Sequence, residues 1–429
     1  MNWRSLTRTA AVPAIDDDRD DDGVSRQSID AGYLEAREPS ASASNRHWSH
    51  RLGANAADRV YTAFDVSQPV DDPAELHGRE PQVAQLVSGV LYRRNHGFIA
   101  GLRGSGKTSL VRSFGQSVDR EGIVVLYSAC DNGTTLGDLM RGYLEQIPAS
   151  SLEAGTYEAF QQRVAALPTD CTPNQATSLF AMIQYSQAIV ISDEFDRVTN
   201  EGLRWKVASL LKLVSDARLP VRFVLVGDSS TFADILVAHP SLTRHVTRVS
   251  VDPLSNEAIT ELLHDCADRC SMRFSEGGLD VIADVACGSP YHARLFGLHA
   301  ALAAVEDDSD IIETAHATLG LQSAFQEWSS LNPADGAAMM SIARGAHGNP
   351  DHFMSFARLV AGRSSATQYK NKGNTPVSPE MFAAFGSSVE PAGGELNFRD
   401  PTAPQFLIAL GRVGRRTTNS PAEAVNLDA

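Results

Sequence analysis

The segment Gly101-Leu102-Arg103-Gly104-Ser105-Gly106-Lys107-Thr108, followed by Ser109, decides the fold of this 429-residue chain. It matches the pattern G-x-x-x-x-G-K-[S/T] and separates an apolar, strand-like run from a segment with helical periodicity. Gly104 and Gly106 let the backbone curl so that N–H groups point at phosphate oxygens, at the positive end of the following helix. In such a loop Lys107 reaches the β- and γ-phosphates, and the Thr108 hydroxyl binds Mg²⁺. We therefore predict that residues 101–109 bind ATP with Mg²⁺.

A second apolar run, Ala188–Ser192, ends in the carboxylates of the sequence DEFD at 193–196. We expect Asp193 to hold Mg²⁺ through water, and Glu194 to orient and help deprotonate the attacking water. Taken alone, an Asp-Glu pair after an apolar run is also compatible with the beginning of an ordinary loop. Lys107 upstream favours the catalytic interpretation, and Glu194 indicates hydrolysis as well as binding.

Short runs rich in β-branched residues predict the strands of a parallel sheet that is buried on both faces. They are Phe98–Gly101, Ile123–Ser128, Ala188–Ser192 and Val221–Gly227. Segments with helical periodicity fill the gaps between these runs. The predicted fold class is therefore α/β, with a parallel-sheet P-loop NTPase core over residues 61–252.

Three further regions flank this core. Residues 1–60 contain the acidic run Asp16–Asp22 and little apolar periodicity, which predicts a disordered acidic N-terminal tail; an acidic docking tail is the functional alternative. Residues 253–320 read as amphipathic helices and predict a helical lid. Residues 321–429 predict a helical or winged-helix domain, because helices precede Gly393-Gly394 and the strand-like segment Glu395–Arg399.

Composition limits the partners that the chain can have. The net charge is −15, with 37 basic against 52 acidic residues, so any DNA-binding surface has to be local. No apolar run approaches the roughly 18 residues that a membrane-spanning helix needs, which argues against a membrane protein. The N-terminal residues lack an apolar signal-peptide core, and the five cysteines are scattered, so we expect a cytoplasmic protein with reduced thiols.

A polar tip follows the strand-like run Val221–Gly227. In the sequence Asp228-Ser229-Ser230, we expect Ser229 to contact the γ-phosphate or the attacking water, with Asp228 acting through a water as an alternative. An ordinary turn at this position is the other interpretation.

Taken together, these motifs resemble those of the AAA+ ATPases, in particular the origin-recognition-like and STAND-like branches. The resemblance extends over residues 70–305 and includes Leu76-His77-Gly78-Arg79-Glu80, the two motifs above and VDPLS at 251–255, followed by three helices. It implies that Gly78 and Arg79 line the adenine pocket. It also implies that an arginine before the last core strand projects into a neighbouring subunit. Arg244 occupies that place, with Arg248 as a rival and a surface salt bridge as the alternative.

The same resemblance points to two candidates in the lid. Arg294 is similar to a sensor 2 arginine, but it lies three residues later than the Gly-x-x-Arg spacing, where Tyr291 stands instead. Gly288-Ser289-Pro290 is similar to the Gly-x-Pro element of STAND-type ATPases, in which the proline lies against the adenine. Pro290 is therefore the alternative contact.

Three hypotheses for function share ATP and Mg²⁺ as cofactors. In the first, an ATP-hydrolysing homo-oligomer remodels or loads a protein or DNA partner. In the second, a monomeric STAND-type switch signals to a partner through its C-terminal region. In the third, ATP regulates a DNA-binding winged helix in which Arg412, Arg415 and Arg416 contact phosphates; the neutral charge of residues 321–429 makes this hypothesis the weakest.

Overall fold

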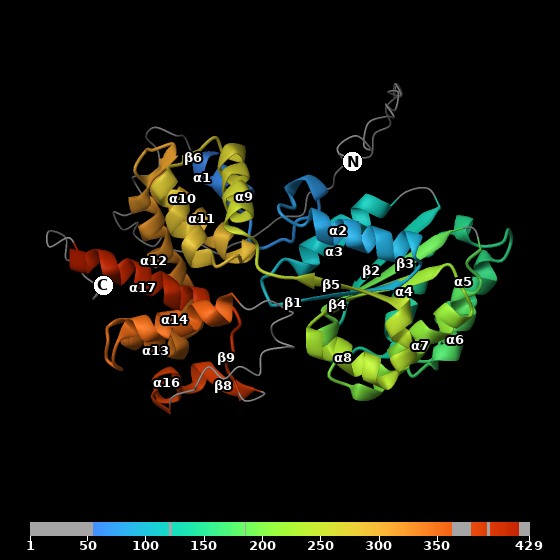
Figure 1. Cartoon of the computed structure of the whole chain (residues 1–429). Helices are drawn as coiled ribbons and strands as arrows, with labels where there is room; N and C mark the ends of the chain where they lie inside the picture. The colour runs from blue at the N-terminus through green and yellow to red at the C-terminus, as the bar shows by residue number, and fades with distance from the viewer. Residues whose placement is uncertain (1–54, 120–121, 185, 363–378, 393–394, 420–429) are drawn as a thin grey trace, which may run out of the picture. The chain divides into compact units, whose positions relative to one another are not determined.

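The computed structural model describes residues 55–119, 122–184, 186–362, 379–392 and 395–419 (Figure 1). Of the tail predicted over residues 1–60, positions 1–54 lie outside these ranges. Residues 55–60 differ from the prediction, because they begin a helix, α1 (Asn55–Ala63). Val60 and Ala63, three residues apart on one face of α1, are buried among the helices of the lid.

Five parallel strands form the central sheet in the order β2-β3-β4-β1-β5, which confirms the predicted α/β fold. The strands are β1 (His96–Gly101), β2 (Ile123–Ala129), β3 (Gln187–Asp193), β4 (Val221–Gly227) and β5 (Val246–Val251). β5 was implied only by the resemblance, because as an edge strand it alternates buried and exposed residues instead of forming an apolar run.

Helices cover both faces of the sheet (Figure 1). One face carries α2 (Glu80–Leu86), which continues as the π-helix η4 (Val87–Tyr92), and α3 (Lys107–Val118). The other face carries α4 (Leu136–Leu144), α5 (Tyr157–Ala165), α6 (Pro173–Phe180), α7 (Glu201–Asp216) and α8 (Ser229–Ala238). Short 3-10 helices connect these elements: η3 (Pro73–Glu75), η5 (Ala149–Ser151), η6 (Phe195–Arg197) and η7 (Pro240–His245).

The segment after β5 is mostly helical. It contains α9 (Asn256–Arg269), α10 (Glu276–Ala286), α11 (Pro290–Glu306), α12 (Thr314–Leu331), α13 (Pro333–Ala343), α14 (Pro350–Ala361), α16 (Pro379–Phe385) and α17 (Ala403–Asn419). Its short strands are β6 (Arg273–Phe274) with β7 (Ile311–Ile312), and β8 (Val389–Ala392) with β9 (Glu395–Phe398); the 3-10 helix η8 (Gly386–Ser388) precedes β8. None of the described helices combines the length and apolarity that crossing a bilayer requires.

The lid and the C-terminal region share one hydrophobic core. The predicted boundary between them, at residues 320 and 321, falls inside α12, which packs closely against α11: a Cβ atom on Gly320 would lie 2.5 Å from the backbone nitrogen of Ala300. Buried side chains from α9, α11, α12, α14 and α17 all belong to this core, including Leu263, Phe296 and Phe406. The two predicted regions are therefore packed as one body.

The C-terminal region contains helices and the predicted antiparallel hairpin, although Gly393 and Gly394 themselves lie outside the described residues. Among the arginines proposed to contact DNA, Arg412 is exposed on α17. Arg415 and Arg416 lie on the same helix, and their side chains are outside the described part of the structure. A DNA-binding winged helix stays a prediction.

Candidate functional site

The loop between β1 and α3 presents backbone N–H groups at the carboxyl end of the sheet. Gly104 (φ +78°) and Gly106 (φ +89°) have left-handed conformations that favour glycine. Gly106 is the N-cap residue of α3, and no side chain caps the helix there. The N–H groups of its first turn are therefore available to an anion, and the helix dipole favours phosphate at this position.

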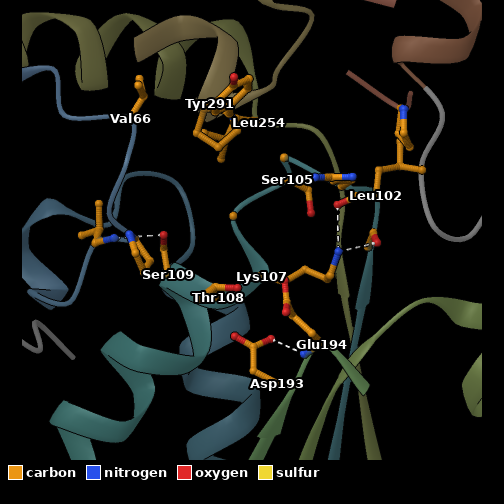
Figure 2. Close-up of a pocket in the computed structure, with 18 of the residues that line it drawn as sticks. Val66, Leu102, Ser105, Lys107, Thr108, Ser109, Asp193, Glu194, Leu254 and Tyr291 are labelled. Atoms are coloured by element: carbon orange, nitrogen blue, oxygen red, sulfur yellow. Dashed lines mark hydrogen bonds between the residues drawn. The ribbon is translucent and has the colours of Figure 1, made fainter. Parts of the chain in front are cut away.

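Lys107, the first residue of α3, lies folded onto this loop (Figure 2). Its Nζ donates hydrogen bonds to the carbonyl oxygens of Gly101 and Leu102, each at 3.0 Å. Burial lowers the pKa of Lys107, and the carboxylates of Asp196 and Asp193 oppose this shift. The amine thus lies among carboxylates at the mouth of the loop and has to leave the two carbonyls in order to bind a phosphate.

Asp193, the last residue of β3, is held by two hydrogen bonds. The Tyr127 hydroxyl donates to its Oδ2 at 2.8 Å, and the Glu194 backbone N–H donates to its Oδ1 at 2.8 Å. Only 2% of Asp193 is exposed. Burial and the bond to Asp193 raise the pKa of Tyr127 to about 12, so the phenol is a neutral donor at physiological pH.

Thr108 and Asp193 are suitable ligands for Mg²⁺. Both line the same pocket, and Figure 2 shows their side chains below the loop, facing the same space. A hydroxyl and a carboxylate are the hard oxygen ligands that Mg²⁺ prefers, and Mg²⁺ usually keeps several waters in addition. The residues present therefore fit the predicted metal.

Glu194 has an unusual backbone and a cationic partner. Its φ is +52°, a left-handed conformation that is costly for a residue with a side chain. Its Oε1 lies 3.1 Å from Nη2 of Arg197, which also lines the pocket. The carboxylate is thus paired with Arg197 rather than free to accept a proton from water.

Three buried polar atoms in the pocket have no partner in the structure. They are the Oγ atoms of Ser105 and Ser229 and Nη2 of Arg294. Leaving such atoms unpaired costs about 1–3 kcal/mol each. The pocket encloses a cavity of about 1270 Å³, so a polar ligand of nucleotide size can enter it and satisfy these atoms.

Ser229 lies where its sequence position predicted, at the tip of β4. Asp228 is the N-cap residue of α8, a helix that the sequence analysis did not predict: its Oδ1 accepts from the backbone N–H of Thr231 at 2.7 Å and from the Ser230 hydroxyl at 2.9 Å. The Asp228 carboxylate is therefore occupied as a helix cap, whereas the Ser229 hydroxyl remains available in the pocket.

Arg79 and Gly78 support the site from behind. Nη2 of Arg79 donates to the carbonyl oxygen of Ser105 at 2.9 Å, and burial lowers the pKa of this guanidinium to about 10. Arg79 lines the pocket, but Gly78 is not among the lining residues. A Cβ atom on Gly78 would lie 2.7 Å from Cβ of Ala258, so this glycine permits the close approach of α9.

An apolar wall faces the phosphate end of the pocket. Val66, Leu254 and Tyr291 lie across the cavity from Asp193 (Figure 2), and Leu76 and Leu262 complete this wall. An adenine ring requires such a surface. Apart from Tyr291 and Leu76, these residues were not singled out in the sequence, because isolated apolar residues in a linker and a lid helix carry no motif.

The two lid candidates both reach the pocket from α11. Cγ of Pro290 lies 3.5 Å from the position that a Cβ atom on Gly106 would occupy, so the proline covers the phosphate loop. Arg294 is 8% exposed, and its Nη1 donates to the carbonyl oxygen of Asp65 at 3.2 Å. The structure thus brings Pro290 and Arg294 together at one site and does not choose between them.

Arg244 and Arg248 do not lie in this pocket. Arg244 is exposed in η7, next to Val246, which pairs with His96 at the start of β1, whereas the phosphate loop follows the end of β1. A six-residue strand spans about 20 Å, so Arg244 lies at the opposite end of the sheet from its own phosphate loop. Arg248 is exposed in the middle of β5.

Residues from the C-terminal region also line the pocket, and sequence reasoning missed them. They are Asn397 and Arg399, next to the hairpin, and Pro401. Nε of Arg399 lies 3.7 Å from Oε2 of Glu390 on the other hairpin strand. Nearly 300 residues separate this segment from the phosphate loop, so no local pattern could place it here.

A buried histidine connects the lid to this C-terminal segment. Nε2 of His292 lies 3.0 Å from the carbonyl oxygen of Thr402, and Nδ1 lies 2.8 Å from Oγ of Ser289. Burial lowers the pKa of His292 to about 3, so the ring is neutral. Since a carbonyl only accepts, Nε2 carries the proton and Nδ1 accepts from Ser289.

The fold and the site define a P-loop nucleotide-binding protein: a parallel α/β sheet with a glycine-rich loop at a helix N-terminus, opposite a buried aspartate. Comparison with known families refines this class, because residues 75–229 match the family model for the AAA ATPase domain. The chain therefore contains an AAA ATPase domain and belongs to the AAA+ class of P-loop ATPases, as its motifs implied.

Solved structures of similar fold include three proteins. The ORC2 protein of Aeropyrum pernix, in ADPNP and ADP complexes, is 15% identical, covers 83% of this chain and 98% of its own, and has a TM-score of 0.48. A Walker-type ATPase of Pyrococcus abyssi is 16% identical over 80% and 99%, with a TM-score of 0.45. The RuvB Holliday junction branch migration motor of Thermotoga maritima is 14% identical over 77% and 95%, with a TM-score of 0.39. A search of curated proteins found no match.

Proposed function

We propose that this protein binds ATP with Mg²⁺, hydrolyses it, and couples the nucleotide state to the remodelling or loading of a protein or DNA partner. One observation supports nucleotide binding above the others: buried, unpartnered polar atoms of Ser105, Ser229 and Arg294 face one cavity that the phosphate loop closes. The AAA ATPase domain supports ATP as the nucleotide.

Each residue has a defined task in this proposal. The N–H groups of the loop and Lys107 bind the phosphates, after Lys107 has left the carbonyl oxygens of Gly101 and Leu102. Bound Mg²⁺, held by Thr108 and through water by Asp193, would neutralise charge on the phosphate oxygens. Glu194 orients the attacking water and accepts its proton.

Two variants separate binding from hydrolysis. Lys107→Ala is expected to weaken the binding of a fluorescent ATP analogue by at least tenfold, because the loop loses its only lysine. Glu194→Gln is expected to bind the analogue like the wild type and to release phosphate at least ~100-fold more slowly, as expected for loss of a general base. Hydrolysis by Glu194→Gln at the wild-type rate would show that Glu194 is not the base.

Remodelling by an oligomer rests on Arg244. This residue is exposed, has no ion pair or hydrogen bond among the described residues, and lies too far from its own phosphate loop to act there. We expect Glu194→Gln to form a larger species with Mg-ATP, measured by light scattering, and Arg244→Ala to reduce hydrolysis. Arg248→Ala is the matched control, because Arg248 is exposed on the adjacent strand. Hydrolysis lost in Arg248→Ala alone would assign the finger to Arg248.

A STAND-type switch is the second candidate, and the C-terminal lining of the pocket favours it. Asn397 and Arg399 reach the same cavity as the phosphate loop, and Pro290 covers Gly106. In a switch of this kind, a nucleotide exchange changes the contact of the C-terminal segment with the pocket. A monomer with and without Mg-ATP, together with an Arg399→Ala variant of altered nucleotide affinity, would favour the switch over the oligomer.

A further inference from the structure

We propose that Tyr127 is a positioning residue for Asp193 and holds the aspartate carboxylate in the orientation that Mg²⁺ coordination requires. The inference rests on the proposed function, because it concerns the metal that accompanies ATP. It concerns a strand residue that no sequence motif marks and that is not among the residues lining the pocket.

The register of the sheet brings Tyr127 to the aspartate. Strand β2 lies beside β3, with Ala129 opposite Asp193, so Tyr127 lies two residues before that pair and on the same face as Ala129. Its hydroxyl donates to Oδ2 of Asp193 at 2.8 Å, and the Glu194 N–H donates to Oδ1 at 2.8 Å. One donor on each oxygen fixes the rotation of the carboxylate about its bond to Cβ.

The ring of Tyr127 is itself fixed from α3. The guanidinium carbon of Arg112 lies 5.0 Å from the centre of the ring, within the range of a cation–π contact. Nη1 of Arg112 lies 3.4 Å from Oδ1 of Asp71. Arg112 lies on the helix that begins with Lys107 and Thr108. The same helix thus supplies the phosphate and metal ligands and braces the tyrosine that orients the aspartate.

Loss of the Tyr127 hydroxyl should therefore affect the metal and not the nucleotide itself. Residues that orient a metal ligand from the outside typically contribute 10–100-fold to metal affinity. In Tyr127→Phe the Glu194 N–H still binds Oδ1, but Oδ2 loses its protein donor and the carboxylate is less restricted. The nucleotide contacts of the loop are unchanged, because Tyr127 does not line the pocket.

The test measures how Mg²⁺ strengthens the binding of a fluorescent, non-hydrolysable ATP analogue to the full chain. For Tyr127→Phe we expect the half-saturating Mg²⁺ concentration to rise about tenfold or more, with unchanged affinity in EDTA. Tyr143→Phe is the matched control. The Tyr143 hydroxyl donates to the Ile191 carbonyl and to Oγ of Ser192, both at 2.9 Å, so it binds the same strand without touching Asp193. This control is expected to need as much Mg²⁺ as the wild type.

Asp193→Asn separates failure of this inference from failure of the proposed function. If Asp193→Asn needs more Mg²⁺ and Tyr127→Phe does not, the positioning role is overturned and the metal site stands. If Tyr127→Phe also loses affinity in EDTA, the tyrosine supports the fold in general, and the positioning role is again overturned. If Asp193→Asn needs no more Mg²⁺ than the wild type, the metal assignment in the proposed function is wrong.

Discussion

Acid is expected to destabilise this protein through His292. The pKa of this residue falls from its usual 6.5 to about 3 because the ring is completely buried between Ser289 and Thr402. Between these two pH values the unfolded chain binds a proton that the folded chain does not, so stability rises with pH across this window. The contribution is fully present above pH 6.5 and is lost as the pH falls toward 3.

The magnitude follows from these two pKa values. Between pH 7 and pH 5, a histidine with a pKa of 6.5 when unfolded and about 3 when folded reduces the free energy of unfolding by about 2 kcal/mol. His96 is also completely buried, with its pKa lowered to about 3, and it contributes a similar amount. The two contributions lie in different cores, so each is removed by its own variant.

The assay is urea unfolding of the wild type and of His292→Gln at pH 7 and pH 5. The variant is less stable at pH 7, because glutamine does not reproduce both hydrogen bonds of the ring. Its further loss between pH 7 and pH 5 is expected to be about 2 kcal/mol smaller than that of the wild type, because glutamine takes up no proton. Carboxylates titrate equally in both proteins and cancel. His347→Gln, at an exposed position, controls for the exchange itself. Equal losses in the wild type and His292→Gln would refute the reasoning.

Three further outcomes are expected. Gly106→Ala puts a side chain at φ +89°, which costs about 1–2 kcal/mol and should weaken binding of an ATP analogue about tenfold; unchanged affinity would contradict the conformational argument. Arg197→Ala removes the partner of Glu194 and should raise the rate of phosphate release, whereas a slower rate would mean that Arg197 contacts the nucleotide. Arg79→Leu leaves the Ser105 carbonyl without its donor and should lower the free energy of unfolding by about 1–3 kcal/mol in urea; no loss would show that water replaces the guanidinium.

The parts of the site that could be predicted are those whose chemistry is local. The loop at 101–108 combines glycines, a lysine and a hydroxyl in one short segment, and β3 delivers Asp193 directly after a continuous apolar run. Both features result from contacts within a few residues of the chain. The fold class followed from the same runs, because strands buried on both faces are uniformly apolar.

The unpredicted parts depend on tertiary packing. Helix α8 was missed because LVGDSS looked like a turn, although Asp228 at its N-cap is a signal that was available. The boundary at residue 320 was misplaced because Gly320, which resembles a helix break, serves the packing of α12 on α11. Arg399 at the pocket, and Tyr127 on Asp193, result from contacts between distant segments, which no pattern in the sequence records.

The shared core of the lid and the C-terminal helices has a mechanical consequence. Because α11 and α17 are packed in one body, Pro290 cannot lift from the phosphate loop while the segment at 397–401 stays in place. The nucleotide pocket and the C-terminal hairpin then form the two arms of one lever. A partner that grips α17 would pull on the lid directly, and the work of the proposed nucleotide cycle would be delivered at the hairpin as one rigid stroke.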